Sequence, residues 1–259
     1  FKTNFMYSYF KNMFNIFYQG VIMIRVVKLK PILGVMAITF LSFILCLSFN
    51  YIASASKNNE YFKYTIVLDA GHGGWDGGCV GTTTGVTEAE INLQITKKLK
   101  EYLTNFGFNV VLTRNGDDAL GKDKTSDMEK RKQIINRVNP FMVISIHANS
   151  FSDSSEYGTQ TFYEINDEKS KELADSIQEQ MKVHLSNARE NSNHGEYYML
   201  ECSNAISCIV ECGFLSNSND EELLNDEEYR NNVAYSIYSG IVKYLICSGS
   251  TTTQNESVS

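Results

Sequence analysis

Four side chains able to bind a metal ion or move a proton come where apolar segments end or a helix begins. His72 follows the run YTIVLDA, His147 closes FMVISIH, Glu211 closes ISCIVE, and Glu88 opens a helical pattern. Two imidazoles and one carboxylate form a ligand set typical of catalytic zinc sites and leave one position for water. A second carboxylate beside them can take a proton from that water. The residues therefore indicate a hydrolytic metal site, with the roles of the two carboxylates left open.

Each of the four residues also has a simpler interpretation. A histidine that ends a strand is often only a hydrogen-bonded part of the fold, and Glu88 can complement the dipole of its helix. Glu211 can be a solvated strand end, although IVECGF places its carboxylate among apolar neighbours. Such a carboxylate is costly to bury unless it is paired or functional. The occurrence of all four at one expected sheet edge favours a functional cluster.

The segments that must position these residues alternate between strand and helix patterns. Short apolar runs predict strands over residues 64–70, 108–114, 141–148, 159–165, 196–200 and 206–212. Apolar residues at helical spacing predict helices over residues 88–106, 126–139, 167–185 and 227–246. This order implies an α/β fold: a single domain with a mostly parallel twisted sheet of about six strands and helices on both faces. Ligand sites in such sheets lie at the carboxyl ends of the strands.

The loop after the first strand, GHGGWDGG, is rich in glycine but does not fit a dinucleotide-binding pattern. G-x-G-x-x-G would need its third glycine at Asp76, and the next helix begins only at Glu88. Thr87 and Glu90 form a T-x-x-E capping box that marks this helix start. The glycines instead permit a sharp backbone path around His72.

The distribution of charge argues against two kinds of partner. The chain of 259 residues has a net charge of −7, yet residues 1–55 hold five basic and no acidic side chains. All acidic residues therefore lie after residue 55, and that part of the chain is strongly negative. It is not expected to bind nucleic acid, or an anionic membrane surface, by general attraction.

The N-terminal part has the pattern of an export segment. Residues 1–30 form a basic extension, which can include residues upstream of the true start because the chain opens on Phe1. Residues 31–55 carry no charge and are typical of a signal peptide or a membrane anchor, two alternatives that stay open. Ala53 and Ala55 offer a small-x-small cleavage site, and the basic residues before the segment predict that the chain after residue 56 lies outside the cytoplasm.

The remaining boundaries follow from the same patterns. A folded domain is expected over residues 60–247. The polar segment 248–259, SGSTTTQNESVS, has no apolar periodicity and is expected to be disordered.

The six cysteines do not form a metal-binding pattern, because no C-x-x-C pair occurs. Cys202 with Cys208, or Cys208 with Cys212, would be the local choices for a disulfide. Buried free thiols are favoured, since a domain of about 200 residues can build a core without such links.

Five motifs lie in one order across residues 64–246: LDAGHGG-D-G-VG, TEAEINL, LTRNGD, RKQIINRVNP-MVISIHAN and IVECGFLSN. Together they resemble the zinc-dependent N-acetylmuramoyl-L-alanine amidases of the amidase-3 family. The chain departs from the family pattern at Ala70, where proline is usual, and at Cys79, where a small residue is usual. Neither change is expected to touch the metal, and Cys79 is expected to pack beneath the loop.

The resemblance implies roles for individual residues. One zinc ion (Zn2+) would be held by His72, Glu88 and His147, and Glu211 would be the catalytic glutamate. Asn92 lies one helical turn after Glu88 and is a candidate to orient that ligand.

The sequence indicates less about the roles of the two other histidines, His194 and His184. His194 precedes an expected strand and is a candidate for contact with glycan, or an ordinary surface histidine. His184 lies on the apolar stripe of its helix and is interpreted as structural.

The resemblance also implies a reaction, which is hydrolysis of the amide between the lactyl group of N-acetylmuramic acid and L-alanine in peptidoglycan. The substrate would be a peptidoglycan glycan strand with its stem peptides, and the need for an activator protein stays open. HGEYYML (194–200) and NNVAYSIYSGIVKYL (231–245) resemble the CwlD-type, germination-specific amidases of endospore formers. That similarity implies a role in spore cortex maturation, where muramic-δ-lactam forms.

Alternatives to this interpretation remain. They are a vegetative cell-wall amidase, a zinc peptidase or deacetylase acting on another wall bond, and a non-catalytic wall-associated scaffold. The expected location is exported or membrane-anchored on the outer side of a bacterial membrane, which in a sporulating cell includes the space between forespore and mother-cell membranes.

Overall fold

A computed structural model describes residues 11–15, 39–42 and 64–255 of the chain. The chain divides into two compact units, Phe1–Asn59 and Glu60–Ser259, and the fold below is that of the second. Of the expected export segment over residues 31–55, only 39–42 are described. Among the described residues, no helix has both the length and the apolar character needed to cross a membrane.

The second unit is built on a six-stranded sheet in the order β2-β1-β3-β6-β4-β5. The strands are β1 (Thr65–Ala70), β2 (Asn109–Leu112), β3 (Met142–Asn149), β4 (Gln160–Tyr163), β5 (Asn193–His194) and β6 (Ile206–Phe214). All neighbouring pairs are parallel except β4 and β6, which run antiparallel. The predicted α/β fold with a mostly parallel sheet is confirmed.

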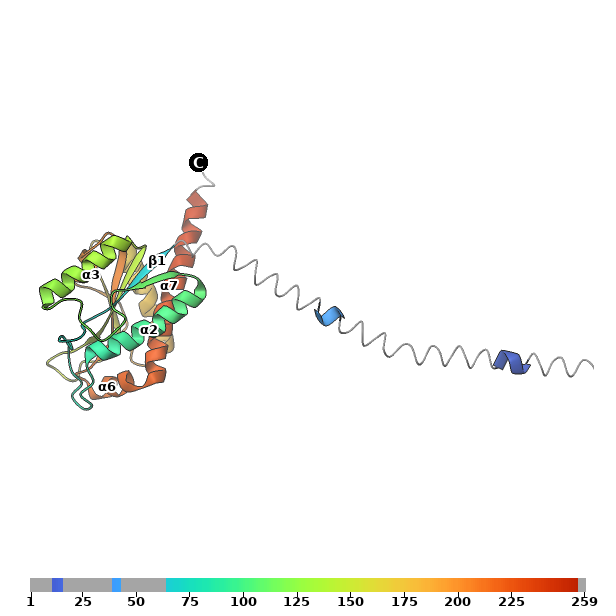
Figure 1. Ribbon diagram of the computed structural model, residues 1–259, viewed down its shortest axis with the longest axis horizontal. Helices are drawn as coiled ribbons and strands as arrows, with labels where there is room; N and C mark the ends of the chain where they lie inside the picture. Colours follow the sequence, from blue (N-terminus) through green and yellow to red (C-terminus); the bar gives the residue numbers. More distant parts are fainter. Residues whose placement is uncertain (1–10, 16–38, 43–63, 256–259) are drawn as a thin grey trace, which may run out of the picture. The chain divides into compact units, whose positions relative to one another are not determined.

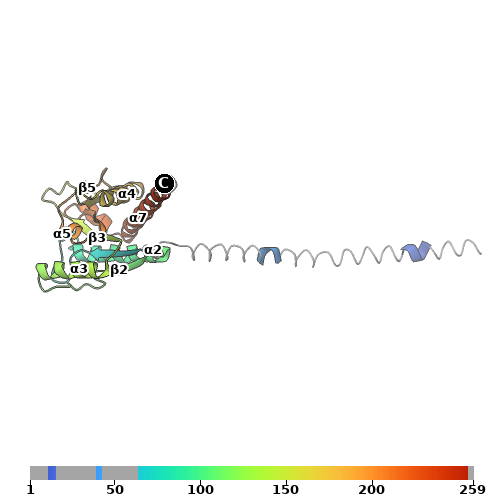
Figure 2. The same cartoon turned by 90° about the horizontal axis from the view of Figure 1, so that it is seen from above.

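Helices cover both faces of the sheet, as Figures 1 and 2 show. They are α2 (Glu88–Phe106), α3 (Lys124–Val138), α4 (Glu168–His184), α5 (Tyr198–Glu201), α6 (Ser218–Asn225) and α7 (Glu227–Asn255). Buried residues of α2, α4 and α7 form one apolar cluster with alternate residues of the central strands. Buried residues of α3 and α5 form a second cluster with the residues in between, such as Val67 and Val143.

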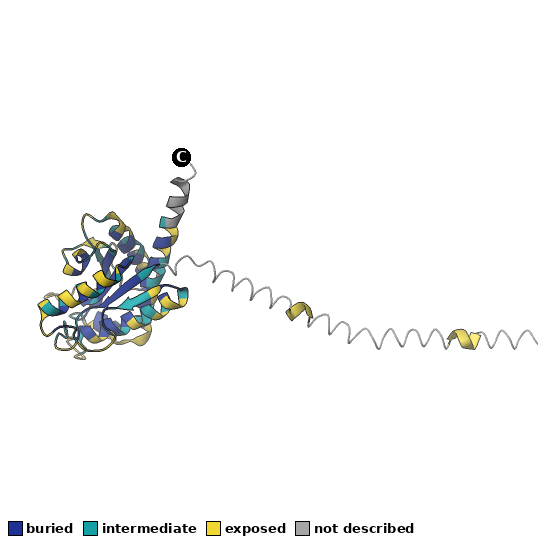
Figure 3. Cartoon of the chain, turned by 45° about the horizontal axis from the view of Figure 1, so that its top comes forward, coloured by how far each residue is buried: buried dark blue, intermediate teal, exposed yellow. Residues whose placement is uncertain are grey.

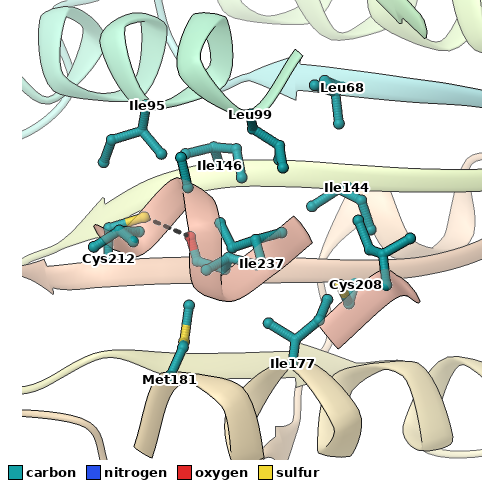
Figure 4. Packing of buried hydrophobic residues seen from close by; sticks show 14 of the residues in the cluster. Leu68, Ile95, Leu99, Ile144, Ile146, Ile177, Met181, Cys208, Cys212 and Ile237 are labelled. Carbon is teal, nitrogen blue, oxygen red and sulfur yellow. Dashed lines mark hydrogen bonds between the residues drawn. The ribbon is translucent and has the colours of Figure 1, made fainter. Parts of the chain in front are cut away.

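The central strands have apolar side chains toward both clusters, which explains their nearly continuous apolar sequences. Figure 3 shows the central strands as the buried layer of the domain. In Figure 4, Ile95 and Leu99 of α2 point toward Ile146 of β3. Ile177 of α4, at the bottom of the view, points toward the segment of α7 that carries Ile237. All five side chains are at most 1% exposed, so this packing holds the strands in fixed register.

The helix starts follow from side-chain caps. The Thr87 hydroxyl accepts a hydrogen bond from the Glu90 amide, as the capping motif predicts. Asp123 and Ser126 form a reciprocal capping box, so α3 begins at Lys124, before the predicted Ser126. Gly107 ends α2 in the left-handed conformation, with φ 114°.

The predicted strand over residues 196–200 is wrong. These residues instead contain α5, a single helical turn, and the neighbouring strand is the short β5. The apolar run YYML suggested a strand, but Met199 and Leu200 are both buried against the second apolar cluster. Adjacent residues of a strand point to opposite faces, so burial of this pair on one side requires a turn.

The C-terminal part differs from expectation in two places. Helix α6 was not predicted, because SNDEELLN has too few apolar residues to show a helical period. Helix α7 continues past the predicted end at residue 246 and reaches Asn255, so helix covers most of the segment expected to be disordered. Residues 256–259 lie outside the described residues.

The cysteines of the described region are free thiols. Cys202, Cys208 and Cys212 are buried, Cys79 is partly buried and Cys247 is exposed. Neither of the two candidate disulfides forms, and the domain relies on its apolar core instead.

Candidate active site

His72 lies two residues beyond β1, in an unusual backbone conformation. Its φ is 62°, in the left-handed region that residues with a side chain rarely adopt. The Gly71 amide still donates to the Ile146 carbonyl at 3.0 Å, so the pairing with β3 continues to the residue before His72. The chain then turns sharply, and this turn directs His72 at the carboxyl edge of the sheet.

His147 and Glu211 face the same edge from adjacent strands. They are register partners on β3 and β6, so their side chains emerge on the same side of the sheet. The His147 ring occupies the space above Gly71, where a Cβ atom would lie only 2.2 Å from His147 Cε1. A glycine at position 71 is therefore required for the ring to reach the site.

Glu88 is the first residue of α2, and its carboxylate is held by several donors. Oε2 accepts from the Cys79 amide at 3.0 Å, and Oε1 lies 3.3 Å from both the Ala148 amide and Asn92 Nδ2. A Cβ atom at Gly78, which also has positive φ, would lie 2.4 Å from Glu88 Oε2. This second glycine therefore makes room for the carboxylate.

His72, Glu88 and His147 form one compact donor set, in which potential ligand atoms all lie within 4.8 Å of one another. Glu88 Oε1 is 2.9 Å from His147 Nδ1 and 3.2 Å from His72 Nε2. Donor atoms around a tetrahedral zinc ion with bonds of about 2.0–2.2 Å lie roughly 3.3 Å apart. Two imidazoles and a carboxylate at these separations fit zinc in number, type and spacing.

The electrostatics of the cluster favour a positive charge between the three side chains. Burial opposes ionisation of Glu88, but its contacts with the His147 and His72 rings prevail and lower the pKa of its carboxyl. Burial likewise disfavours charged imidazoles, yet the Glu88 carboxylate raises the pKa of both His72 and His147. A bound cation would supply this positive charge and leave both imidazoles neutral.

Glu211 has a different environment. It is buried, and its Oε2 has no hydrogen-bond partner among the described residues. Burial raises the pKa of its carboxyl to about 7. A carboxylate with an unpaired oxygen beside a metal-binding cluster is suited to accept and return a proton near neutral pH.

Comparison with known proteins identifies the family. A family model described as N-acetylmuramoyl-L-alanine amidase (Amidase_3) matches residues 66–243. The chain belongs to this amidase family. The germination-specific N-acetylmuramoyl-L-alanine amidase of Bacillus subtilis (strain 168) is 33% identical to it over 190 residues, which cover 70% of this chain and 79% of the relative.

Solved structures agree with this assignment. The CwlD amidase from Clostridioides difficile, solved in complex with the GerS lipoprotein, has 40% sequence identity and a TM-score of 0.68, covering 71% of this chain and 99% of that one. The catalytic domain of CwlV from Bacillus (Paenibacillus) polymyxa var. colistinus has 30% identity and a TM-score of 0.64, covering 70% and 98%. The chain is thus an N-acetylmuramoyl-L-alanine amidase, and its resemblance to the CwlD type is confirmed.

Two further residues of the amidase, Asn92 and Asp76, contact the candidate ligands. Asn92 is fully buried, and its Nδ2 lies 3.2 Å from the Gly71 carbonyl oxygen as well as 3.3 Å from Glu88 Oε1. Asp76 Oδ2 lies 2.9 Å from His72 Nδ1, the ring nitrogen that faces away from Glu88. The sequence pattern did not indicate a role for Asp76. Its place four residues after His72 was nevertheless a signal, because a carboxylate near a candidate histidine ligand often orients that ligand.

Two buried arginines hold the backbone of the His72 loop. Arg131 donates to the His72 carbonyl at 2.6 Å and to the Ala70 carbonyl at 2.7 Å, and Arg114 donates to the Gly71 carbonyl at 3.0 Å. Arg131 also pairs with Asp69 at 2.7 Å. Burial disfavours a charged carboxylate, but Arg131 and two hydroxyl donors lower the pKa of Asp69. Sequence analysis missed these arginines because their partners lie far away in the chain.

A cavity of about 310 Å³ opens beside the cluster, and its lining includes His72, His147, Asp76, Lys124 and Tyr197. It gives a substrate access to the candidate metal site.

The other predicted histidines lie elsewhere. His194 is exposed on the edge strand β5, two strands away from β6, and is not brought to the cluster. His184 is exposed at the end of α4, where its ring contacts the Tyr235 ring with 5.2 Å between centroids.

Proposed function

We propose that this amidase is zinc-dependent and hydrolyses the amide between the lactyl group of N-acetylmuramic acid and L-alanine in peptidoglycan. The observation that carries the proposal is the convergence of His72, Glu88 and His147 beside the buried, unpaired carboxylate of Glu211. Family membership restricts the reaction to amide hydrolysis. The ligand set and its spacing support zinc as the ion.

Each residue then has a distinct task. His72, Glu88 and His147 would hold the ion, which when bound would supply a Lewis acid to polarise the scissile carbonyl and lower the pKa of water. Asn92 and Asp76 orient the ligands Glu88 and His72 through the contacts described above.

Glu211 moves the proton. Its Oε2 accepts the proton that the attacking water loses, and the carboxyl group then returns that proton to the nitrogen of the leaving L-alanine. The low polarity around this carboxyl supports both steps, because a pKa of about 7 favours neither the protonated nor the ionised form strongly near neutral pH.

Product analysis tests the reaction directly. Purified peptidoglycan treated with the amidase should release stem peptides with a free L-alanine amino terminus, which mass spectrometry identifies. Release of peptides cut at another bond would favour the zinc peptidase alternative. Release of acetate would favour a deacetylase, and release of nothing from several peptidoglycans would favour the scaffold.

We further propose that the amidase acts in spore cortex maturation, outside the cytoplasm, and contributes to formation of muramic-δ-lactam. The similarity to the germination-specific B. subtilis amidase and to C. difficile CwlD supports this role. The CwlD structure contains the GerS lipoprotein, which supports a partner protein for this amidase too. The expected export segment is consistent with such a location.

Deletion of the gene distinguishes this role from a vegetative one. The spore cortex of the deletion strain should lack muramic-δ-lactam, and its spores should fail to complete germination. Normal lactam content and normal germination, together with chains of unseparated cells, would instead indicate a vegetative wall amidase.

A further inference from the structure

Trp75 is the one tryptophan of the chain, and it lies on the loop that carries His72. The residue is 53% exposed, whereas His72 and Asp76 on the same loop are partly buried. The ring is nevertheless fixed, because the indole nitrogen donates to the Gly121 carbonyl at 2.7 Å. An exposed aromatic ring that is already held in one orientation can bind a ligand at little further cost in conformational entropy.

A chain of short hydrogen bonds connects the Trp75 anchor to His72. The Gly121 amide donates to Asp127 Oδ1 at 3.0 Å, and Asp127 Oδ2 accepts from Arg131 Nε at 2.7 Å. Arg131 in turn donates to the His72 carbonyl at 2.6 Å. The network that anchors the indole thus belongs to the same rigid surroundings that hold the His72 loop, as a substrate-positioning group requires.

Residues of the Trp75 loop line two hollows in the surface. Asp76, the next residue, lines the 310 Å³ cavity that contains His72 and His147. Gly74 and Gly77 line a second groove of about 490 Å³, whose other walls include Gln94 and Lys97. Trp75 therefore stands in the chain between residues that line both hollows, on a loop that an extended ligand contacting both would meet.

We propose that Trp75 is a stacking platform for a pyranose ring of the peptidoglycan glycan strand, and that it sets which amide reaches the metal site. The axial C–H groups of a pyranose face carry partial positive charge and pack on the negative face of an indole. Gln94 and Lys97 of the second groove can bind the hydroxyl and acetamido groups of the next sugar. The proposal rests on the function proposed above, because it assigns a subsite for the same substrate.

Fluorescence of the single tryptophan reports on this subsite directly. We expect Glu211→Gln protein to show a saturable change in emission with GlcNAc–MurNAc oligosaccharides stripped of stem peptides, and with chitohexaose. Free stem peptide should leave the emission unchanged. This measurement does not require catalysis.

Kinetics on intact peptidoglycan provide the second measurement. Trp75→Ala should lower kcat/KM about tenfold through KM, with kcat and zinc content near those of the wild type. Trp75→Phe should recover most of the loss, because it keeps an aromatic face. Ile165→Ala is the matched control, since Ile165 is 58% exposed and follows the antiparallel β4 at the opposite edge of the sheet, and it should not change kcat/KM.

Several results would overturn the assignment. They are an emission that does not respond to glycan, wild-type kinetics for Trp75→Ala in an active enzyme, or loss of zinc from that variant. An emission that changes only with protein concentration would point to a second copy of the chain as the partner. If the wild type released no stem peptides while glycan still shifted the emission, the amidase proposal would fail and the glycan subsite would stand.

Discussion

At the scale of single residues, the candidate site depends on the difference between two glutamates. Glu88 is surrounded by donors, whereas Glu211 Oε2 has no partner among the described residues. Their environments push the pKa values of the two carboxyls in opposite directions. Such a separation is what distinguishes a ligand from a proton carrier in one site.

Replacement of Glu211 by glutamine therefore tests its role. The variant keeps the shape of the side chain but cannot accept a proton, so release of stem peptides should fall by about two to four orders of magnitude. Zinc, measured by elemental analysis, should remain bound. The double variant His72→Ala with His147→Ala is the control and should lose zinc. Loss of zinc from Glu211→Gln would identify Glu211 as a ligand instead.

At the scale of elements, the site depends on contacts that the sequence pattern does not reveal. The strand ends and the capped start of α2 were predictable, so His72, Glu88, His147 and Glu211 could be placed at one edge from local signals. The arginine contacts to the His72 loop were not, because they join α3 and the segment after β2 to this loop across 43 to 61 residues of chain. The YYML segment was misread because one buried helical turn and one short strand have the same apolar content.

The α3 contact predicts an effect of Arg131 on metal binding. Arg131→Lys keeps the charge but loses the fork that reaches both Asp127 and the His72 carbonyl. Zinc affinity, measured by competition with a chelator, should fall by about tenfold or more. Gln178→Ala is the control, because Gln178 is also buried and hydrogen-bonded but contacts β4 instead. An equal loss of affinity in both variants would indicate only general destabilisation.

The contact between α6 and the loop before α2 predicts a dependence of stability on pH. Glu221 is buried and accepts from the Thr82 hydroxyl, from the Thr83 amide, and from both the amide and the hydroxyl of Thr84. Although burial opposes ionisation, these donors lower the pKa of Glu221 to about 2. A lowered folded-state pKa gives stability that is present above the unfolded pKa and is lost as pH falls toward 2.

Glu221→Gln should therefore be less stable than the wild type by about 1–3 kcal/mol at pH 7. Urea unfolding at pH 7, 5 and 3 should show this difference shrinking below about pH 5. Glu222→Gln is the matched control, since its side chain is exposed, and should show no such trend. A difference that stays constant down to pH 3 would contradict the assigned cause.

At the scale of the whole molecule, the elements of the sheet and its apolar core all lie after residue 63. The fold class and the parallel order were predictable because strands and amphipathic helices alternate along this part of the chain. The antiparallel placement of β4 was not, since a strand of only four residues (Gln160–Tyr163) carries too little pattern to show its direction.

This arrangement predicts that the domain folds without the N-terminal segment. A chain that begins at Lys57 should be soluble and monodisperse and should unfold cooperatively, because no strand or helix of the second unit is removed. Circular dichroism and size-exclusion chromatography measure this. Aggregation of the shortened chain, reversed by restoring residues 31–55, would show that the apolar segment takes part in folding.

The strand order also bears on when the enzyme becomes active during its synthesis. β6 is the last strand to leave the ribosome, yet it pairs with β3 in the middle of the sheet. A nascent chain that has emerged only through β3 already carries all three candidate ligands but lacks Glu211. Such an intermediate could collect a metal ion without being able to cut a wall. Hydrolytic competence would arrive only when residues 206–214 insert, so the chain completes its proton-transfer site after its metal site.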